Sequence, residues 1–464
     1  MPRENLPFTR DQLKARPVLI LAHISDKQAG FTRTDILRGL ANHISDPLEL
    51  RTASDQVMAS SELVQISKGT RTQYTTREYL TAERSLETVA SEMAQSGGFK
   101  VGPSNIGRAI KRENDRLQNR SRGQLSDEQV AAIDHILRPN QLSSVVGLAG
   151  VGKSTLLAVA RDAWERQGYM VHGAALAGKA ADSLETASSI ASRTLASLEA
   201  SWKCGYEPVG HGSIVVIDEA GMVGKRQLMR VIEQLRHRGC KLVLVRGPDQ
   251  LQPIQAGTPF RDIVDLNGAA ELVEIRRQAS DWQRAASRDL ARGQTHTALQ
   301  SYADHGVVHD KKDRDQAIAA LVDDYVADWM ENGEFISRLA LAHRRIDVHA
   351  INQAIRAARA IKTGPKSETL FTTDHGPRAF PVGDRILFTR NDGTLGVRNG
   401  MLGTILAVGD NKLTVHLDPD GNDNRRRLTF TPQEFSSIDH GFAVSNALGH
   451  FVKSRFDGRS CFIA

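Results

Sequence analysis

The sequence predicts an α/β protein built around a parallel β-sheet that helices cover on both faces. Short runs of strand-forming residues at 143–146, 214–217 and 242–245 lack the apolar–polar alternation of a sheet with one solvated face. Helical periodicity separates these runs, as in chains where crossover helices join parallel strands. A glycine-rich turn links the first run to the helix after it, which is the third observation.

The strands and helices of this α/β region follow one another from about residue 123. The strand at 143–146 leads through the turn into a helix over about 155–167, and a second strand spans 169–176. The strand at 214–217 precedes a helix whose apolar residues recur three and four positions apart. We therefore predict one α/β domain over residues 123–330.

Residues 1–122 are rich in charge and helical in pattern. Thr75 and Glu78 have the spacing of a capping box, in which two side chains satisfy backbone N–H groups at a helix start. Apolar residues then recur at steps of three and four as far as Met93, which gives the helix one buried face. A glycine pair ends it. This region predicts a helical accessory domain that precedes the α/β domain.

The C-terminal part starts with a strand at 338–342 and a helix over 348–360. Residues 381–430 then follow a different pattern, because glycines interrupt short alternating runs. Such runs are typical of small antiparallel sheets and barrels. We predict a second domain over 331–464 that carries a small β-barrel insertion at about 378–435.

Composition excludes several classes of protein. The 464 residues carry a net charge of +6 with a pI near 9.2, which favours a polyanionic partner only weakly. No run approaches the roughly 18 apolar residues of a membrane span, and no segment has the flanks of a signal peptide. We therefore expect a cytoplasmic protein without membrane segments. Three widely spaced cysteines predict neither a disulfide framework nor a zinc site.

Residues 147–154, Gly-Leu-Ala-Gly-Val-Gly-Lys-Ser, match the phosphate-binding pattern G-x-x-x-x-G-K-[ST] in full. The glycines let backbone N–H groups surround phosphates, and the following helix N-terminus adds positive potential. Lys153 is expected at the β- and γ-phosphates of ATP, and Ser154 on its Mg²⁺. The nucleotide site would also include Gly147, Gly150, Gly152 and Thr155. The alternative is a glycine-rich turn that binds no ligand.

Asp218 and Glu219 follow the apolar strand at 214–217 directly. Beside a phosphate-binding loop, the two carboxylates of an acidic pair at a strand end are expected to have different roles. Asp218 would hold the Mg²⁺ shell, and Glu219 would orient or deprotonate the attacking water. The alternative is a solvated pair that starts the next helix.

Three further residues have two interpretations each. Gln250 lies just beyond the strand at 242–245, where an amide can sense the γ-phosphate, and an ordinary proline-containing loop explains it equally well. Arg277 is a candidate arginine finger or one of a surface pair at a helix start. Gln129 is a candidate for reading the adenine edge, although helix capping with Ser126 explains most of the same residues.

Together these motifs resemble those of RecD-type superfamily-1 DNA helicases, and more closely the helicase part of Ti-type conjugative transfer relaxases, the TraA family. The segments similar to the Q motif and to motifs I, Ia, II, III and IV are residues 125–129, 147–154, 177–181, 218–222, 250–253 and 275–278. The resemblance implies a RecA-like P-loop motor, and an incomplete second RecA-like domain with an SH3-like barrel. It also implies ATP and Mg²⁺ as cofactors and 5′ to 3′ movement on single-stranded DNA contacted by Lys179 and Thr194. Relaxosome or other conjugation proteins are the implied partners.

The chain departs from the family pattern at three points. Arg246 and Gly247 stand where motif III has Gly and Asp, which removes a carboxylate near the Mg²⁺. Residues 438–444 resemble the approach to motif V, but motifs V and VI do not follow. The nicking domain of a relaxase is also missing. We therefore expect a piece of a relaxase, truncated at both ends, that binds ATP and DNA and hydrolyses ATP slowly.

Two other functions remain open from the sequence. One is an ATP- and DNA-binding module without productive helicase activity. The other is a P-loop phosphotransferase unrelated to DNA, which the positions of Lys179 and Thr194 disfavour.

Overall fold

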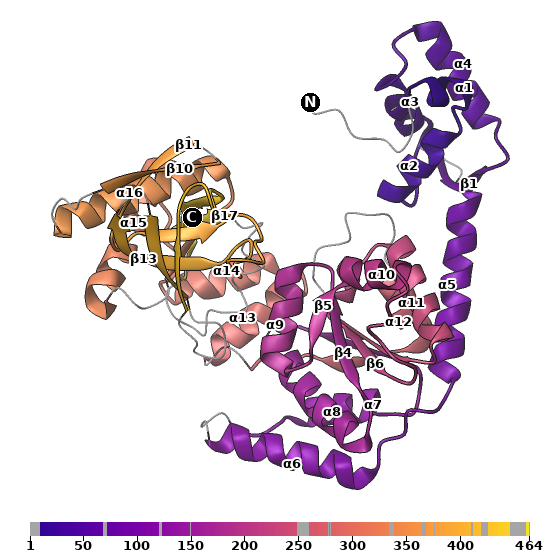
Figure 1. Ribbon diagram of the computed structural model, residues 1–464, viewed down its shortest axis with the longest axis horizontal. Coiled ribbons are helices and arrows are strands. Elements are labelled where there is room, and N and C mark those ends of the chain that lie inside the picture. Colours follow the sequence, from indigo (N-terminus) through magenta and orange to yellow (C-terminus); the bar gives the residue numbers. More distant parts are fainter. Residues whose placement is uncertain are drawn as a thin grey trace. The chain divides into compact units, whose positions relative to one another are not determined.

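A computed structural model of the chain (Figure 1) describes residues 10–67, 72–119, 123–148, 150–247, 259–276, 278, 280–333, 338–363, 368–374, 376–409, 412–418, 426–445 and 461–463. The chain divides into two compact units. The first contains residues 1–149, 153–176 and 190–274, and the second contains residues 150–152, 177–189 and 275–464.

A six-stranded, all-parallel sheet forms the centre of the first unit, in the order β5-β4-β6-β7-β3-β8. In chain order its strands are β3 (Leu142–Gly147), β4 (Val171–Ala175), β5 (Ser192–Thr194), β6 (Ile214–Ile217), β7 (Lys241–Arg246) and β8 (Ala270–Leu272). Every residue of β6 and β7 is buried, which is why neither sequence alternates between apolar and polar residues. The predicted parallel sheet is confirmed, and its order places β7 between β3 and β6.

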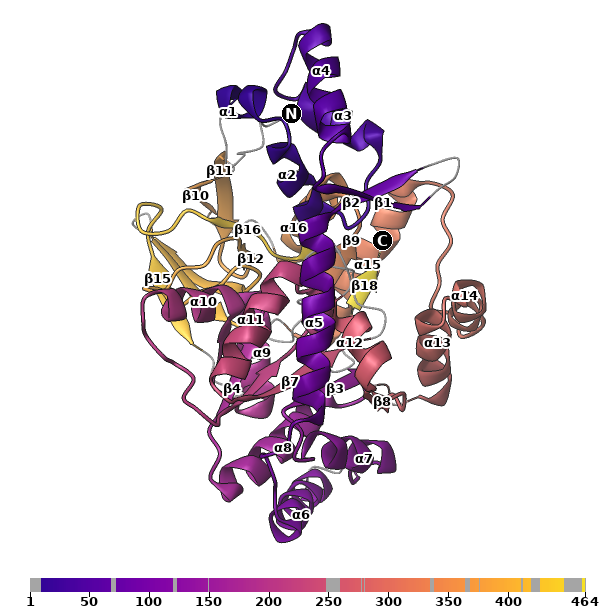
Figure 2. The same cartoon turned by 90° about the vertical axis from the view of Figure 1, so that its right-hand side faces the viewer.

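Some helices of this unit precede the first strand of the sheet, and the others lie between its strands along the chain. They are α5 (Arg77–Gln95), α6 (Pro103–Asn119), α7 (Asp127–Ile136), α8 (Lys153–Gln167), α10 (Leu195–Lys203), the 3₁₀ turn η1 (Ala220–Met222), α11 (Lys225–His237) and α12 (Pro259–Asn267). Helix α5 packs against α11, α12 and β3, and Figure 2 shows it in front of the sheet between them. Leu86, Val89 and Met93 of α5 are buried in the core that this packing forms, as its periodicity predicts.

The start of α5 corrects the sequence-based expectation by one residue. Thr76 is the N-cap, and its hydroxyl accepts a hydrogen bond from the backbone N–H of Tyr79 at 3.1 Å. Thr75 and Glu78 are therefore not the capping pair, and Thr75 instead belongs to a short strand.

Residues 10–76 have a hydrophobic core of their own. Their elements are α1 (Arg10–Ala15), α2 (Leu19–Lys27), α3 (Arg33–Ala41), α4 (Pro47–Met58), β1 (Leu63–Ser67) and β2 (Gln73–Thr76). The two strands form an antiparallel hairpin that directly precedes α5. The region that the sequence predicts as helical therefore also contains a β-hairpin.

The second unit combines helices with three sheets. Its helices are α9 (Gly178–Ser188), α13 (Asp281–Ala291), α14 (Thr295–Asp304), α15 (Arg314–Asn332) and α16 (Arg345–Thr363). Strand β9 (Leu339–Ala342) pairs in parallel with β17 (Ala443–Ser445) and β18 (Cys461–Ile463). Helices α15 and α16 pack with β9 and β17 around one core, to which Tyr325 and Phe442 contribute.

An antiparallel sheet is inserted in the sequence between α16 and β17. Its five strands are β12 (Arg385–Phe388), β13 (Leu402–Gly409), β14 (Lys412–Leu417), β15 (Arg427–Phe430) and β16 (Ile438–His440), in the order β15-β14-β13-β12-β16. The hairpin of β10 (Glu368–Thr373) and β11 (Gly376–Pro381) contributes Phe371 and Phe380 to the same core. This confirms an antiparallel insertion, whereas the SH3-like barrel stays a prediction. None of the helices described above is long and apolar enough to cross a membrane.

Candidate nucleotide-binding site

The phosphate-binding loop joins the carboxyl end of β3 to the start of α8. Gly150 has a φ of 87° and Gly152 a φ of 84°, and both values lie in the left-handed region that only glycine adopts without a steric penalty. The pattern needs glycine at these positions for this reason. Helix α8 begins directly after the loop at Lys153, and the N-terminus of a helix attracts anions such as phosphate.

The Lys153 side chain folds across this loop. Its ammonium donates hydrogen bonds to the carbonyl oxygens of Gly147 at 2.6 Å and Leu148 at 3.1 Å. The backbone N–H of Leu148 in turn donates to the carbonyl of Leu272 in β8 at 3.1 Å. These bonds hold a positive charge at the carboxyl end of β3, where a phosphate group would meet it.

Asp218 and Glu219 follow β6 and lie at the same edge of the sheet, because β3 and β6 are parallel and only β7 separates them. Burial raises the pKa of Asp218, while the Glu219 N–H bond to its Oδ1 at 2.9 Å and the charge of Lys153 lower it. Burial and the negative charge of Asp218 raise the pKa of Glu219, and Lys153 again opposes the rise. The predicted lysine and both predicted carboxylates therefore interact electrostatically.

The backbone at Glu219 is left-handed, with φ 55° and ψ 34°. Such a conformation costs a non-glycine residue on the order of 1–3 kcal/mol and is concentrated at functional sites. Here it turns the chain sharply after Asp218 into η1. The turn is also crowded, because a Cβ atom added at Gly221 would lie 2.1 Å from Cδ of Arg246.

The side chains at this edge suit a magnesium ion. Mg²⁺ prefers oxygen ligands and is commonly held by one or two carboxylates together with substrate phosphates. Asp218 keeps a second carboxylate oxygen beside the one that Glu219 N–H occupies, and Ser154 offers a hydroxyl in the first turn of α8. The described residues, this edge included, form no cluster of three or more His, Cys, Asp or Glu that could hold a metal ion by itself.

The structure assigns capping roles to two of the predicted site residues. Gln129 is buried and forms a capping box with Ser126, since its N–H donates to the Ser126 hydroxyl and its Oε1 accepts from the Ser126 N–H at 3.1 Å. Thr194 is the N-cap of α10 and accepts from the N–H of Ser197 at 3.1 Å. Contacts of Gln129 with adenine and of Thr194 with DNA stay predictions.

Three other predicted residues cannot be assigned in the same way. Gln250 and Arg277 lie outside the described residues, as does the side chain of Lys179 on α9. The backbone next to Arg277 is described, and the N–H of Arg276 donates to the carbonyl of Gly150 at 2.9 Å. The segment similar to motif IV therefore reaches the phosphate-binding loop.

Two residues near the site make contacts that the sequence did not predict. Oε2 of Glu128 accepts the backbone N–H groups of Val273 and Glu274, each at 2.9 Å, which ties the start of α7 to the chain after β8. Arg246, at the end of β7, is 9% exposed, and its guanidinium lies 5.8 Å from the ring centre of Phe260. The only indication of Arg246 in the sequence is that it replaces the glycine of motif III.

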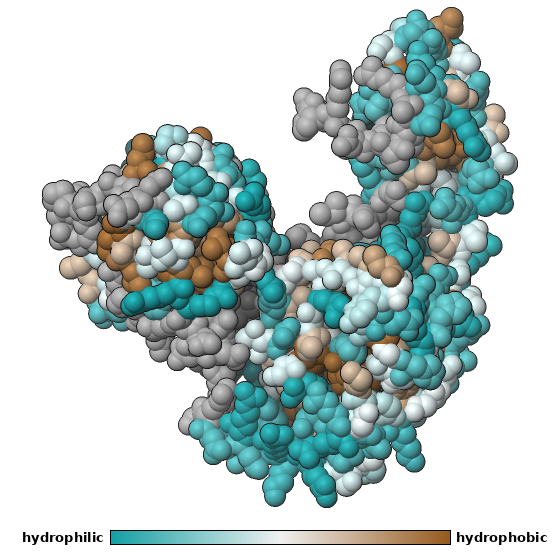
Figure 3. Space-filling view, in the orientation of Figure 1, coloured by the Kyte–Doolittle hydropathy of each residue, from teal (hydrophilic) through white to brown (hydrophobic). Residues whose placement is uncertain are grey.

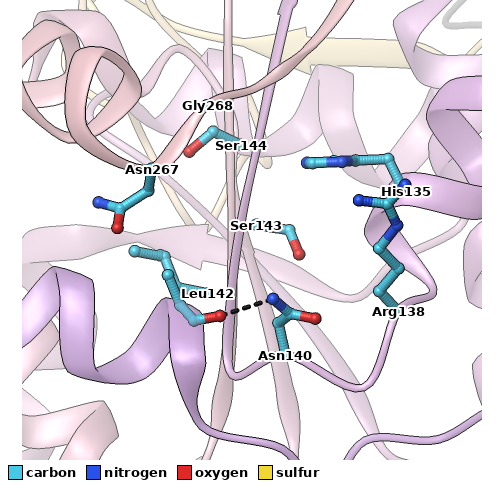
Figure 4. Close-up of a pocket in the computed structure, with 9 residues that line it drawn as sticks. His135, Arg138, Asn140, Leu142, Ser143, Ser144, Asn267 and Gly268 are labelled. Atoms are coloured by element: carbon cyan, nitrogen blue, oxygen red, sulfur yellow. Dashed lines mark hydrogen bonds between the residues drawn. The ribbon is translucent and has the colours of Figure 1, made fainter.

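A small pocket opens at the opposite end of the same sheet (Figure 4). His135, Arg138 and Asn140 line it together with the first residues of β3. Beside it, the fully buried Lys241 donates hydrogen bonds to the carbonyls of Arg138 at 2.8 Å and of Asn140, and burial lowers the pKa of Lys241 to about 7. Ligands of open α/β sheets bind at the carboxyl ends of the strands, so this pocket is distinct from the nucleotide site.

Comparisons with known proteins show which proteins the chain is similar to. Residues 124–313 match the family described as AAA domain. The chain is 34% identical over 439 residues to the conjugal transfer protein TraA of Rhizobium radiobacter, which covers 92% of this chain and 38% of the relative. It is also 34% identical over 447 residues to TraA of Agrobacterium fabrum, covering 94% and 39%. The ATP-dependent RecD2 DNA helicase of Deinococcus radiodurans is 25% identical over 356 residues, or 71% of this chain and 44% of the relative.

Solved structures of Pif1 helicases are more distant. The Bacteroides Pif1 structure bound to single-stranded DNA is 18% identical, has a TM-score of 0.45, and covers 73% of this chain and 92% of that chain. The chain spans about two fifths of the length of the TraA relatives, 38% in the first of them. The predicted resemblance is confirmed: over nearly all of its length, the chain is homologous to one portion of the TraA conjugal transfer proteins.

Proposed function

We propose that this chain is an ATP-dependent DNA helicase or translocase portion of a conjugative transfer protein, and that it moves 5′ to 3′ along single-stranded DNA. The observation that carries the proposal is the shared sheet edge of Lys153, Asp218 and Glu219, where the lysine's charge acts on both carboxylates. The AAA match and the helicase named among the relatives support the same function. Relaxosome proteins are the proposed partners, in the cytoplasm.

Each residue of the edge has a proposed role. The glycines of the loop and Thr155 admit the phosphates to backbone N–H groups, and Lys153 neutralises the β- and γ-phosphates. Ser154 and Asp218 hold Mg²⁺, which supplies charge stabilisation at the transferring phosphoryl group. Glu219 orients the attacking water and accepts its proton, for which a raised pKa makes a carboxylate a better base.

The remaining predicted residues complete the motor. Gln129 would contact the adenine, Gln250 would sense the γ-phosphate, and Arg277 would stabilise charge in the transition state. Lys179 and Thr194 would contact the DNA strand. Family resemblance supports these roles, and the bond of Arg276 to Gly150 supports that of its neighbour Arg277.

A second candidate function has a specific observation in its favour. Arg246 and Gly247 replace the Gly–Asp pair of motif III, and the Arg246 side chain packs against Gly221 behind the acidic pair. A chain without that third carboxylate would bind ATP and DNA without productive unwinding. Both candidates require the same nucleotide site and differ in turnover.

ATP turnover with and without single-stranded DNA tests the proposal. We expect DNA to stimulate turnover, and Lys153→Ala and Glu219→Gln each to lower it by about 10²- to 10³-fold. Glu271→Gln is the matched control, because Glu271 is an exposed carboxylate on β8 of the same sheet. Tight ATP binding with negligible turnover would favour the binding module. Turnover indifferent to DNA would contradict both functions.

A further inference from the structure

Residues 19–76 combine three helices and a β-hairpin in a specific order. Helices α2, α3 and α4 precede the hairpin of β1 and β2. Phe31, between α2 and α3, forms an antiparallel bridge to Tyr74 in β2, with N–H···O distances of 2.9 and 2.7 Å between their backbones. The order is therefore helix, short strand, helix, helix and hairpin, with the short strand beside β2. This is the arrangement of a winged helix, in which a helix-turn-helix is followed by a β-hairpin.

The second helix of the helix-turn-helix is held firmly. Asp46 caps α4 by accepting the backbone N–H groups of Leu48 and Glu49 at 2.9 and 2.8 Å, and Pro47 occupies the first turn. Ala53 and Val57 bury one face of α4 against Ile36 and Leu40 of α3 and their neighbours. The opposite face of α4 therefore stands in solvent in a fixed orientation.

The exposed face of α4 is polar, and its acidic groups are already paired. The exposed residues of α4 are Pro47, Leu48, Glu49, Arg51, Thr52, Asp55 and Gln56. Lys14 binds Glu49 at 2.7 Å, and Arg33 binds Asp55 at 2.8 Å. Among the described residues Arg51 has no ion-pair partner. The face therefore presents Arg51 and Gln56, both long hydrogen-bonding side chains, without uncompensated negative charge.

We infer that α4 is a recognition helix and that residues 10–76 bind double-stranded DNA. An α-helix with its side chains is about 10–12 Å wide, which matches the roughly 12 Å major groove of B-DNA. Arg and Gln are the side chains that bond guanine and adenine edges there, and Leu48, which is 75% exposed, suits a thymine methyl group. In the helix-turn-helix proteins of known mode, the second helix enters that groove.

A single strand or a protein partner fits this face less well. A single strand offers no groove for a helix to enter. Protein interfaces have an apolar core, whereas Leu48 is the one large apolar residue on this exposed face. The visible surface of residues 10–76 is also largely hydrophilic (Figure 3). The inference rests on the proposed function, because a motor that follows one strand of DNA works beside duplex.

Fluorescence anisotropy of the full chain tests the inference. The probes are a labelled duplex of about two helical turns, roughly 20 bp, and a labelled single strand of the same length. The test variant is Arg51→Ala combined with Gln56→Ala. We expect it to bind the duplex about 5- to 150-fold more weakly than the unaltered chain, with a smaller dependence of affinity on salt. Binding of the single strand should not change.

The control variant is Arg84→Ala, which removes an exposed arginine from the middle of α5. It should leave duplex binding unchanged, and circular dichroism should show that all variants are folded. Equal duplex affinity of the test variant and the unaltered chain would overturn the inference, as would an equal loss in the control. DNA-stimulated ATP turnover of the unaltered chain separates the two proposals, because turnover without duplex binding by that chain would support the motor and overturn the recognition helix.

Discussion

Replacing the buried Lys241 by methionine tests how far this buried amine lowers the free energy of unfolding. Burial lowers its pKa from 10.5 to about 7, which corresponds to about 5 kcal/mol at 1.36 kcal/mol per pH unit, to order of magnitude. Below pH 7 the amine is protonated in both the folded and the unfolded chain, and the free energy of unfolding is lowered by the full amount. Between pH 7 and about 10 only the unfolded chain holds it, so the free energy of unfolding rises with pH.

The assay is urea unfolding followed by tryptophan fluorescence, since Trp164 is fully buried in the same unit. Between about pH 7.5 and 9.5 the unaltered chain should gain about 2–3 kcal/mol relative to Lys241→Met, which cannot titrate. Lys203→Met is the control, because Lys203 is exposed at the end of α10. Parallel pH profiles for the unaltered chain and Lys241→Met would refute the reasoning. They would show that the carbonyls of Arg138 and Asn140 keep the amine charged.

Two further predictions concern the nucleotide site. Gly221→Ala should lower the free energy of unfolding by about 1–3 kcal/mol, because the added Cβ would overlap Arg246. Adding Arg246→Ala should restore part of that loss in thermal melts, and additive losses would show that the two residues do not touch. ATP turnover should rise with pH through a value above the usual range of a glutamate, because the proposed role of Glu219 requires its ionised form and its pKa is raised. An acid limb that persists unchanged in Glu219→Gln would assign the titration to another group.

The strands and the site motifs were predictable because each depends on local sequence. Strands β6 and β7 are buried on both faces, so their apolar runs are unbroken. The loop glycines were predictable because positive φ values demand them. Asp218 follows β6 directly, so its position at the sheet edge follows from the strand itself.

Other features depend on contacts distant in sequence and were not predictable. The left-handed backbone of Glu219 is unusual for its residue type, and nothing in the local sequence indicates it. The contact of Arg246 with Gly221 joins the end of β7 to the 3₁₀ turn η1, which only the fold brings together. The hairpin of β1 and β2 has strands of 5 and 4 residues, which are too short for a clear alternating pattern.

The charges at the nucleotide site explain why it would select ATP together with its metal rather than a bare anion. Burial raises the pKa of both Asp218 and Glu219, and the charge of Asp218 raises that of Glu219 further. Lys153 offsets only part of these rises. With both carboxylates ionised, the acidic pair carries one more negative charge than Lys153 offsets. A phosphate chain alone would add to this excess, although the loop N–H groups and α8 attract it. A divalent cation held by Asp218 and Ser154 removes the conflict, since it attracts both the carboxylates and the phosphates. The raised pKa values of the acidic pair are therefore what we expect of the proposed site before a cation binds.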